Sequence, residues 1–199
     1  MTACSRLNLS FRSYEITNTP QTEYLVRKQL QSFIYKKTQR KVDVNIYKVQ
    51  GDGNCLFRSI SLGITGTQSQ HQQLRSYIVN HMLNEHIREE TEPLFICQND
   101  NETYYSHLVN MEKNGCWGTD QEIVAAANLL NVSIRCYSRY NSNDMEIQDF
   151  SPHFATNPTC SVACKHDTLY LINSNGSHYN MATVNSIASN NFESNFLEE

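Results

Sequence analysis

The sequence lacks the features that would divide it into several domains or place it in a membrane. Its apolar runs are short, Ile123 to Leu130 being an example, whereas a bilayer-spanning helix needs about 20 apolar residues. The chain has only 4 prolines and 7 glycines among 199 residues, and no Pro/Gly-rich linker or internal repeat interrupts it. Its first residues show no basic stretch followed by an apolar block, so we expect no secretory signal peptide. The sequence therefore predicts one cytoplasmic domain with no membrane partner.

Clusters of positive charge are also missing. The chain has 16 Lys and Arg against 20 Asp and Glu, a formal net charge of −4. Its basic residues occur as pairs such as Arg27-Lys28 and Lys36-Lys37 rather than as a patch. Because nucleic acids are bound largely through their phosphates by basic surfaces, we expect no nucleic-acid partner.

The cysteines do not form a recognisable framework. There are 7, an odd number, scattered along the chain, which is a poor basis for paired disulfides inside a cell. Cys160, Cys164 and His166 lie close together, but their spacing fits no common zinc module and no fourth ligand follows. We therefore expect mostly free, buried thiols, with no metal and no cofactor.

What the chain does have is enough apolar content to fold, with 39% hydrophobic and 18% charged residues. Hydrophobic periodicity predicts helices over residues 22–37, 55–63, 68–87, 101–114 and 119–130. Runs rich in β-forming residues between turn signals predict strands over 42–49, 132–137, 145–150, 168–173 and 177–184. This order favours an α+β fold with a small, mainly antiparallel sheet flanked by helices.

Two of these helices carry more detailed predictions. Thr119 and Glu122 have the spacing of a capping box, which is the clearest helix start in the chain. In the helix expected over 101–114, the apolar stripe places Tyr105, Leu108 and Val109 inward.

The two ends of the chain differ from its middle. Residues 1–20 and 185–199 are polar and have no sustained periodicity, so both are expected to be loosely ordered. The folded domain is expected to span residues 21–184.

Cys55 is a candidate nucleophile because of its local context. Gly51-Asp52-Gly53-Asn54 permits a tight turn with exposed backbone N–H groups, and a helix is predicted to begin at Cys55. The positive end of that helix dipole would favour a thiolate, and the N–H groups would supply an oxyanion hole. The residues alone leave open that Cys55 is an ordinary buried thiol.

His178 is a candidate base for the same chemistry. It lies in the run Ser177-His178-Tyr179-Asn180, which we expect to form a strand. Alternate residues of a strand share a face, so Asn180 can fix the imidazole of His178. Taken alone, a histidine beside a tyrosine is more often a partly exposed strand residue than a catalytic base.

Together these segments resemble a known family. Residues 52–59, Asp-Gly-Asn-Cys-Leu-Phe-Arg-Ser, match the nucleophile motif of the ovarian tumour (OTU) cysteine proteases, and His178-Tyr179-Asn180 matches their histidine motif. Trp117-Gly118-Thr119-Asp120-Gln121-Glu122 is similar to the family's Trp-Gly-Gly-x-x-Glu segment, with Thr119 where a second Gly is common. The motifs occur in the family's order, and the resemblance covers residues 42–184.

The resemblance implies a papain-like fold and a thiol-dependent deubiquitinase acting on ubiquitin or polyubiquitin chains. Cys55 would be the nucleophile and His178 the general base and acid. Asp52 would belong to the active-site loop, and Asn180 would orient His178. Trp117 is expected to pack behind the active site.

Three functions remain open from the sequence. The first is an active ubiquitin isopeptidase. The others are a catalytically silent ubiquitin-binding module, which the intact Cys, His and Asn disfavour, and a protease for a ubiquitin-like modifier, which would share the same catalytic residues. We expect a monomer, acting in a host cytosol if its source is viral or bacterial.

Overall fold

The computed structural model describes residues 21–95, 103–139, 145–152, 168–174 and 176–187. Its helices and strands, in chain order, are α2 (Gln21–Thr38), β1 (Val42–Tyr47), α3 (Cys55–Thr65), α4 (His71–Met82), α5 (Glu85–Thr91), the 3₁₀ turn η1 (Glu92–Leu94), α6 (Tyr104–Met111), α7 (Asp120–Leu130), β2 (Ser133–Arg139), β3 (Met145–Phe150), β4 (Thr168–Ser174) and β5 (His178–Ser186).

The strands of the described residues form one five-stranded sheet in the order β1-β5-β4-β2-β3. Its neighbours are antiparallel except β2 and β4, which run parallel. The register pairs Ser174 with His178 at the turn between β4 and β5, and Ile172 with Asn180 two residues further along. The predicted α+β class, with a mainly antiparallel sheet, is confirmed.

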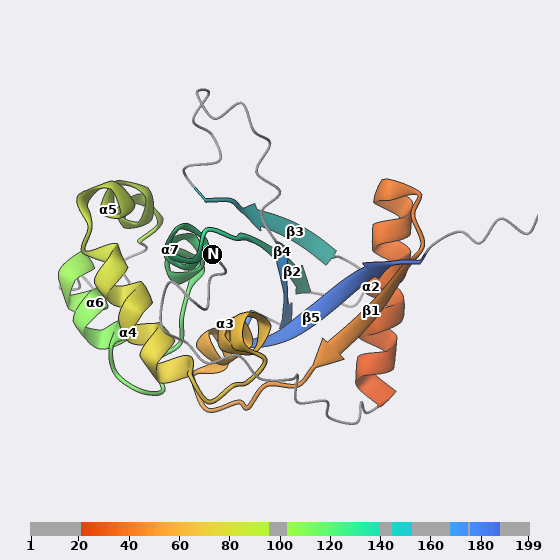
Figure 1. Ribbon diagram of the computed structural model, residues 1–199, viewed down its shortest axis with the longest axis horizontal. Coiled ribbons are helices and arrows are strands. Elements are labelled where there is room, and N and C mark those ends of the chain that lie inside the picture. Colours follow the sequence, from red (N-terminus) through yellow and green to blue (C-terminus); the bar gives the residue numbers. More distant parts are fainter. Residues whose placement is uncertain (1–20, 96–102, 140–144, 153–167, 175, 188–199) are drawn as a thin grey trace, which may run out of the picture.

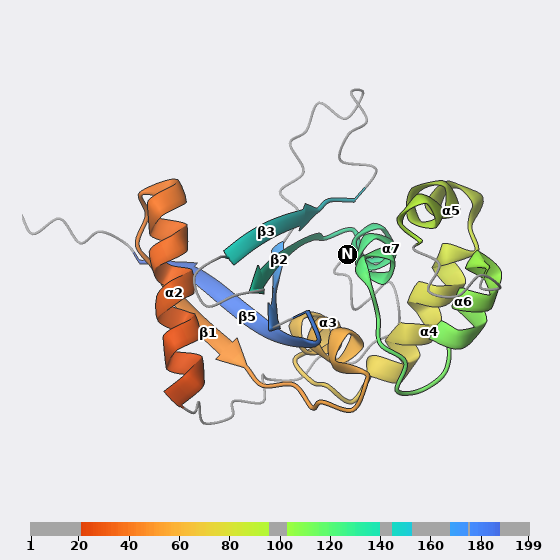
Figure 2. The ribbon, with the colours of Figure 1, turned by 180° about the vertical axis from the view of Figure 1, so that it is seen from behind.

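The sheet separates two hydrophobic cores because successive side chains of a strand point to opposite faces. On one face, Tyr179 and Met181 of β5 join a core built with α3, α4, α6 and α7. On the other, Ala182 of β5 joins Leu30 and Ile34 of α2 in a smaller core. Figures 1 and 2 show α2 beside β1 at one end of the molecule, and α4, α5 and α6 at the other.

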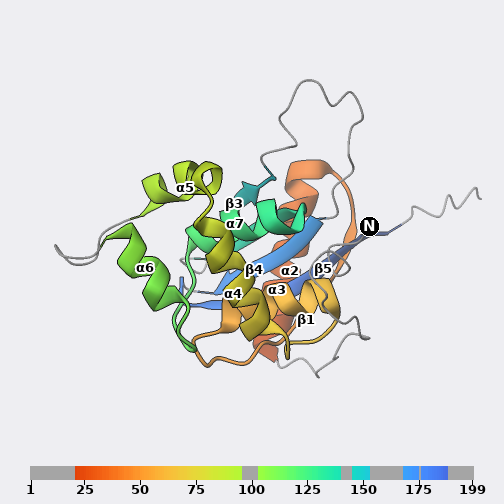
Figure 3. The ribbon, with the colours of Figure 1, turned by 60° about the vertical axis from the view of Figure 1, so that its left-hand side comes forward.

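The helix predicted over residues 68–87 is two helices. Leu83 follows the end of α4, and Asn84 begins α5 by accepting a hydrogen bond from the His86 N–H. Asn is a favoured N-cap because its side chain satisfies an otherwise unpaired amide of the first turn. Of the apolar stripe that periodicity predicts for this segment, Leu74, Ile78 and Met82 are buried and Tyr77 is half-buried. Periodicity did not reveal the break between the two helices. Figure 3 shows α4, α5 and α6 grouped together.

The predicted inward face of the helix at 101–114 is only partly right. Leu108 is buried, but Tyr105 and Val109 are 56% and 66% exposed. The helix extends only from Tyr104 to Met111, and it buries Tyr104, His107, Leu108 and Met111 instead. Tyr105 remains at the surface, where its hydroxyl accepts a hydrogen bond from Arg88. In a helix of only two turns the sequence periodicity is too short to define one apolar face, so the elements that pack against the helix decide which residues are buried.

The other sequence expectations vary in outcome. The Thr119 and Glu122 capping box is present as predicted, and β5 continues to Ser186, two residues past the expected strand end. Residues 1–20 and the Cys160, Cys164 and His166 cluster lie outside the described residues. Within the described ranges no helix is long and apolar enough to cross a membrane, and no three His, Cys, Asp or Glu side chains are grouped as metal ligands.

Candidate active site

Cys55 is the first residue of α3 and is buried, with 6% of its surface exposed. The residues between β1 and α3 carry the chain to it, and Gly53 adopts φ 81°, a left-handed conformation that suits glycine. A Cβ on Gly53 would lie 1.9 Å from the Gly115 carbonyl oxygen. The turn before Cys55 therefore packs directly on the loop formed by residues 115–118.

The start of α3 has no side-chain cap, although Asn54 occupies the N-cap position. Its Oδ1 accepts hydrogen bonds from Arg75 Nη2 at 2.8 Å and from the Gly115 N–H at 2.9 Å. Asn54 is thus directed away from the helix. The amides of the first turn of α3 have no partner within their own helix, so they remain suited to binding a negative charge beside Cys55.

Asp52 stabilises this turn rather than contacting the candidate base. Its carboxylate binds Arg58 Nε, at 3.1 Å to each oxygen, and Arg58 Nη2 at 2.7 Å, and it also accepts the Asn54 N–H at 3.1 Å. The hydrogen bonds from Arg58 hold the pKa of Asp52 well below its usual range. In the described part of the chain these partners occupy the carboxylate, and none of them is His178.

His178 contacts Asn180 instead. The imidazole Nε2 lies 3.2 Å from Asn180 Oδ1, and the same oxygen accepts the Val49 N–H at 3.0 Å. If Nε2 donates to this oxygen, Nδ1 is the nitrogen with a free lone pair. A Cβ on Gly51 would lie 3.7 Å from His178 Nδ1, so this nitrogen lies beside the turn that leads to Cys55.

Helix α3 packs on β5, and Cys55 at the start of α3 lines one cavity together with Ser177 and Tyr179, the two residues that flank His178 in the chain. Within the described residues, no hydrogen bond joins the Cys55 thiol to the imidazole. Catalytic hydrogen bonds are often long without substrate and tighten in the complex. The arrangement can support a thiolate nucleophile, a proton acceptor and an oxyanion site.

Two cavities adjoin this arrangement. One, of about 740 Å³, is lined by Cys55, Trp117, Gly118, Gly176 and Tyr179 among others. The second, of about 290 Å³, lies on the α2 face of the sheet and includes His178 and Asn180 in its lining. The prediction that Trp117 packs behind the site is wrong: its side chain is 62% exposed and borders the cavity that Cys55 lines.

A comparison with protein-family sequence models places the site in a known group. The model described as OTU-like cysteine protease matches residues 50–179. The chain belongs to this family.

Individual relatives agree with this assignment. The chain is 32% identical over 108 residues to the OVARIAN TUMOR DOMAIN-containing deubiquitinating enzyme 9 of Arabidopsis thaliana, covering 54% of this chain and 28% of that protein. It is 32% identical over 93 residues to OTU domain-containing protein 3 of Mus musculus, covering 46% and 22%. The matched region thus spans about a quarter of the length of these relatives.

Solved structures share the fold. The OTUD1 OTU domain superposes with a TM-score of 0.59 at 18% identity, covering 82% of this chain and 99% of that one. The Hazara virus OTU, solved bound to ubiquitin, gives 0.54 at 13% identity, covering 73% and 89%. At such identities the likeness establishes the OTU fold of this chain.

The sequence interpretation missed a buried contact of Glu122, although it included Asp120 and Glu122 in the segment that resembles the family. His107 Nε2 lies 3.0 Å from Glu122 Oε1, and both side chains are buried. His107 also lines the large cavity. Neighbouring Asp120 also lines the cavity. The pKa of its carboxyl group is raised, mainly by burial and to a smaller extent by the negative charge of Glu122. Nothing in the spacing of these residues predicted the pair, because α6 and α7 meet only in the folded chain.

Arg75 is the second omission. It is completely buried in α4 beside Leu74 and Ile78, and it binds groups next to Cys55. A sequence signal for it existed: an arginine stands where the helical period buries apolar residues. Buried arginines are rare unless they are paired.

The described cysteines are free thiols with different surroundings. Cys136 of β2 is 1% exposed, and burial raises its thiol pKa to about 11, which makes it a poor nucleophile at neutral pH. Cys116 lines the same cavity as Cys55 but does not begin a helix. Cys55 alone among the described thiols stands at a helix N-terminus.

Proposed function

We propose that this OTU-family chain is a deubiquitinase that hydrolyses the isopeptide bond after the C-terminal glycine of ubiquitin. The observation that carries the proposal is the placement of Cys55 on an uncapped helix start that borders a large cavity, close to a turn that His178 adjoins. A thiolate, a base and backbone donors are the groups that thiol-dependent acyl transfer requires.

In the first half of the reaction, the Cys55 thiolate attacks the carbonyl carbon of the terminal glycine. The proton of the thiol passes to His178 Nδ1, and the carbonyl oxygen becomes an oxyanion. The free amides in the first turn of α3 would stabilise this oxygen, because a helix N-terminus favours negative charge. Asn180 would hold the imidazolium through Nε2, which becomes a charge-assisted bond once the ring is protonated.

In the second half, His178 delivers its proton to the leaving lysine amine as the C–N bond breaks, and a thioester joins the substrate acyl group to Cys55. The imidazole then accepts a proton from water, whose oxygen attacks the thioester. Collapse of the second oxyanion releases the carboxylate of ubiquitin, and the Cys55 sulfur takes back its proton.

The preference for ubiquitin is supported by the cavity and by the relatives. A substrate that ends in Gly-Gly needs a channel with little room for side chains, and Gly118 and Gly176 line the cavity at Cys55. A Cβ on Gly118 would lie 2.5 Å from Leu56 Cδ2, so the loop packs tightly onto α3 there. Several OTU structures with the same fold were solved in complex with ubiquitin.

The test is covalent labelling with a ubiquitin probe that carries an electrophile at its C-terminus. The expected result is one adduct on Cys55, mapped by peptide mass spectrometry and lost in Cys55→Ala. Cys116→Ala is the matched control, because Cys116 lines the same cavity, and it should still label. Labelling that persists in Cys55→Ala would refute the assignment of the nucleophile.

A panel of probes built on ubiquitin-like modifiers resolves the alternative substrate. If one of these probes labels the chain faster than the ubiquitin probe, the proposed thiol mechanism stands but the substrate is that ubiquitin-like modifier rather than ubiquitin. A cytoplasmic location and a monomeric state remain predictions, which fractionation of cells and light scattering of the purified chain would test.

A further inference from the structure

Arg75 of α4 carries a buried charge with unusual partners. Its side chain is 0% exposed, and its guanidinium carbon lies 3.9 Å from the centre of the Phe57 ring. Its hydrogen bonds to other described residues end on neutral groups rather than on a carboxylate. Burial lowers the pKa of Arg75. Because burying an unpaired charge is costly, these contacts call for an explanation beyond the packing of α4.

The three oxygen acceptors of Arg75 come from three separate segments. Nη2 donates to Asn54 Oδ1 at 2.8 Å and to the Cys116 carbonyl at 2.7 Å, while Nη1 donates to the Met111 carbonyl at the end of α6 at 2.7 Å. The planar guanidinium presents its N–H donors in a fixed fork. It therefore sets the distance between the turn before Cys55 and the loop at 115–118.

The same two segments are joined at further points. The Gly115 N–H donates to Asn54 Oδ1, the oxygen that also binds Arg75. Gly53 packs on the backbone of Gly115 with no room for a Cβ. Arg75 thus closes a network in which the Asn54 amide is directed toward the loop at 115–118 and away from the first turn of α3.

We propose that Arg75 is a positioning residue for Cys55: by holding Asn54 and the Cys116 carbonyl together, it fixes the start of α3 against the wall of the large cavity. This inference rests on the proposed function. Arg75 affects the reaction because the Cys55 thiolate and the backbone N–H donors for the oxyanion belong to the segment that Arg75 holds in place. A displacement of about 1 Å at such a site can cost about 100-fold in rate.

The decisive variant is Arg75→Lys, which keeps a charge but loses the fork that reaches three acceptors. On a ubiquitin substrate with a C-terminal reporter amide, kcat/KM should fall about 10- to 100-fold, mostly through kcat, since the oxyanion exists only in the transition state and intermediates. Alkylation of Cys55 by iodoacetamide needs no oxyanion site, so its rate should stay within about threefold of wild type under conditions where the protein is folded.

Cys136 separates positioning from general loosening. It is 1% exposed, so iodoacetamide reaches it only when the core opens. If the loss of turnover in Arg75→Lys is accompanied by an equal rise in Cys136 alkylation, Arg75 has a merely structural role and the inference is overturned. Unchanged Cys136 alkylation together with reduced kcat supports it.

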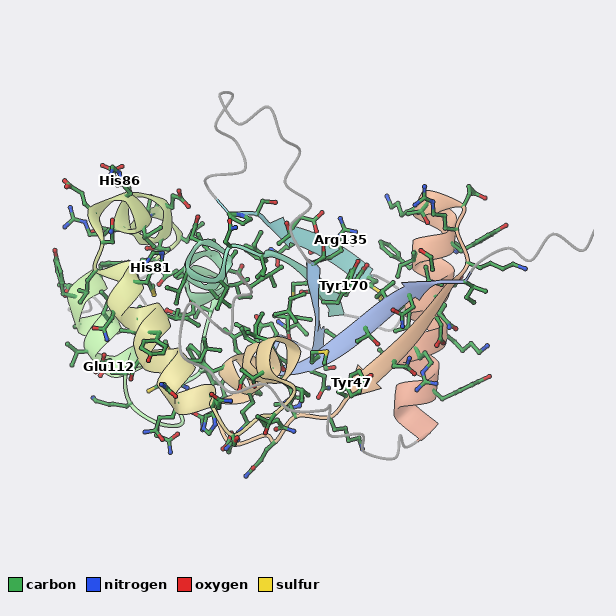
Figure 4. All side chains as sticks on the ribbon, viewed as in Figure 1. Tyr47, His81, His86, Glu112, Arg135 and Tyr170 are labelled. Carbon is green, nitrogen blue, oxygen red and sulfur yellow. The ribbon has the colours of Figure 1, made fainter. Side chains whose placement is uncertain are left out.

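Two more variants complete the test. Asn54→Ala removes the oxygen that accepts hydrogen bonds from both Arg75 and Gly115. In the double variant with Arg75→Lys, the loss of kcat/KM should lie within about threefold of that in the worse single variant, because the effects of groups that act through one network are not additive. Arg135→Lys is the matched control: Arg135 binds Asp149 through Nε at 2.6 Å and Nη2 at 2.8 Å on the sheet. Figure 4 shows Arg135 away from α4, α5 and α6, and this variant should keep wild-type turnover.

The outcomes separate the inference from the proposed function. If the wild type cleaves the ubiquitin substrate and the folded Arg75→Lys variant has the same kcat, the positioning role of Arg75 is overturned while the proposed deubiquitinase activity stands. Absence of ubiquitin turnover in the wild type refutes both. If Arg75→Lys does not fold, Asn54→Ala decides: reduced kcat with wild-type alkylation of Cys55 supports the inference, and wild-type kcat overturns it.

Discussion

Replacing Gly53 with alanine is the sharpest test of the turn that carries Cys55. Gly53 has φ 81°, which costs an L-residue about 1–2 kcal/mol. The new Cβ would also lie 1.9 Å from the oxygen and 2.6 Å from the carbonyl carbon of Gly115. Overpacking of this kind typically costs about 1–3 kcal/mol.

The neighbouring backbone has little freedom to relieve this contact. Gly115 donates its N–H to Asn54, and the next carbonyl, that of Cys116, accepts from the buried Arg75. We therefore expect Gly53→Ala to lose about 2–5 kcal/mol of unfolding free energy. For a chain of this size the loss corresponds to a fall in Tm of roughly 4–20 °C.

Gly51→Ala is the matched control two residues away. Gly51 is not among the residues with positive φ, and its added Cβ would meet only the His178 ring at 3.7 Å, an ordinary contact. Alanine at a compatible glycine position stabilises by about 0.4–1 kcal/mol through the unfolded chain. Thermal unfolding followed by circular dichroism should thus move the two variants in opposite directions. Equal Tm values for both would refute the described packing of the turn.

The remaining predictions concern the imidazole, the carboxylate of the turn and metal. His178→Ala should remove nearly all turnover. Asn180→Ala loses one charge-assisted hydrogen bond of about 1.5–3 kcal/mol, which corresponds to a loss of roughly 10- to 150-fold in kcat/KM. Wild-type kinetics for Asn180→Ala would contradict its role in orienting His178. Asp52 has a lowered pKa when folded, so the stability it contributes is present above its unfolded pKa of about 3.9 and is lost as pH falls below it. Denaturant unfolding should accordingly find Asp52→Asn less stable than wild type at pH 7, with the difference shrinking below about pH 4. A chelator should leave turnover unchanged under reducing conditions, and restoration of lost activity by zinc would contradict the thiol mechanism.

Much of the candidate site follows from local sequence, because its key features are local. The capping box at Thr119 needs only four consecutive residues, and the helix start at Cys55 follows from the turn before it. His178 and Asn180 share a face because strand side chains alternate, and their contact at 3.2 Å depends on that spacing alone. Local rules therefore sufficed for the individual motifs and for the α+β class.

Exposure required the folded chain. Val109 and Trp117 are apolar, and sequence reasoning placed both inside, yet they are 66% and 62% exposed. Hydrophobic patterning tells which side chains can be buried, but the neighbouring elements decide which ones are. The parallel pairing of β2 with β4 was equally beyond local patterning, since β3 lies between them in the chain.

The partners of charged and polar groups were decided by tertiary structure. The sequence determined that Asp52 belongs to the turn before Cys55, but its pairing with Arg58 became visible only in the structure. Arg75 reaches Asn54 and Cys116, 21 and 41 residues away along the chain. Such contacts depend on how α4, α6 and the loops pack together, whereas periods of 3.6 and 2 residues report only the geometry within one element.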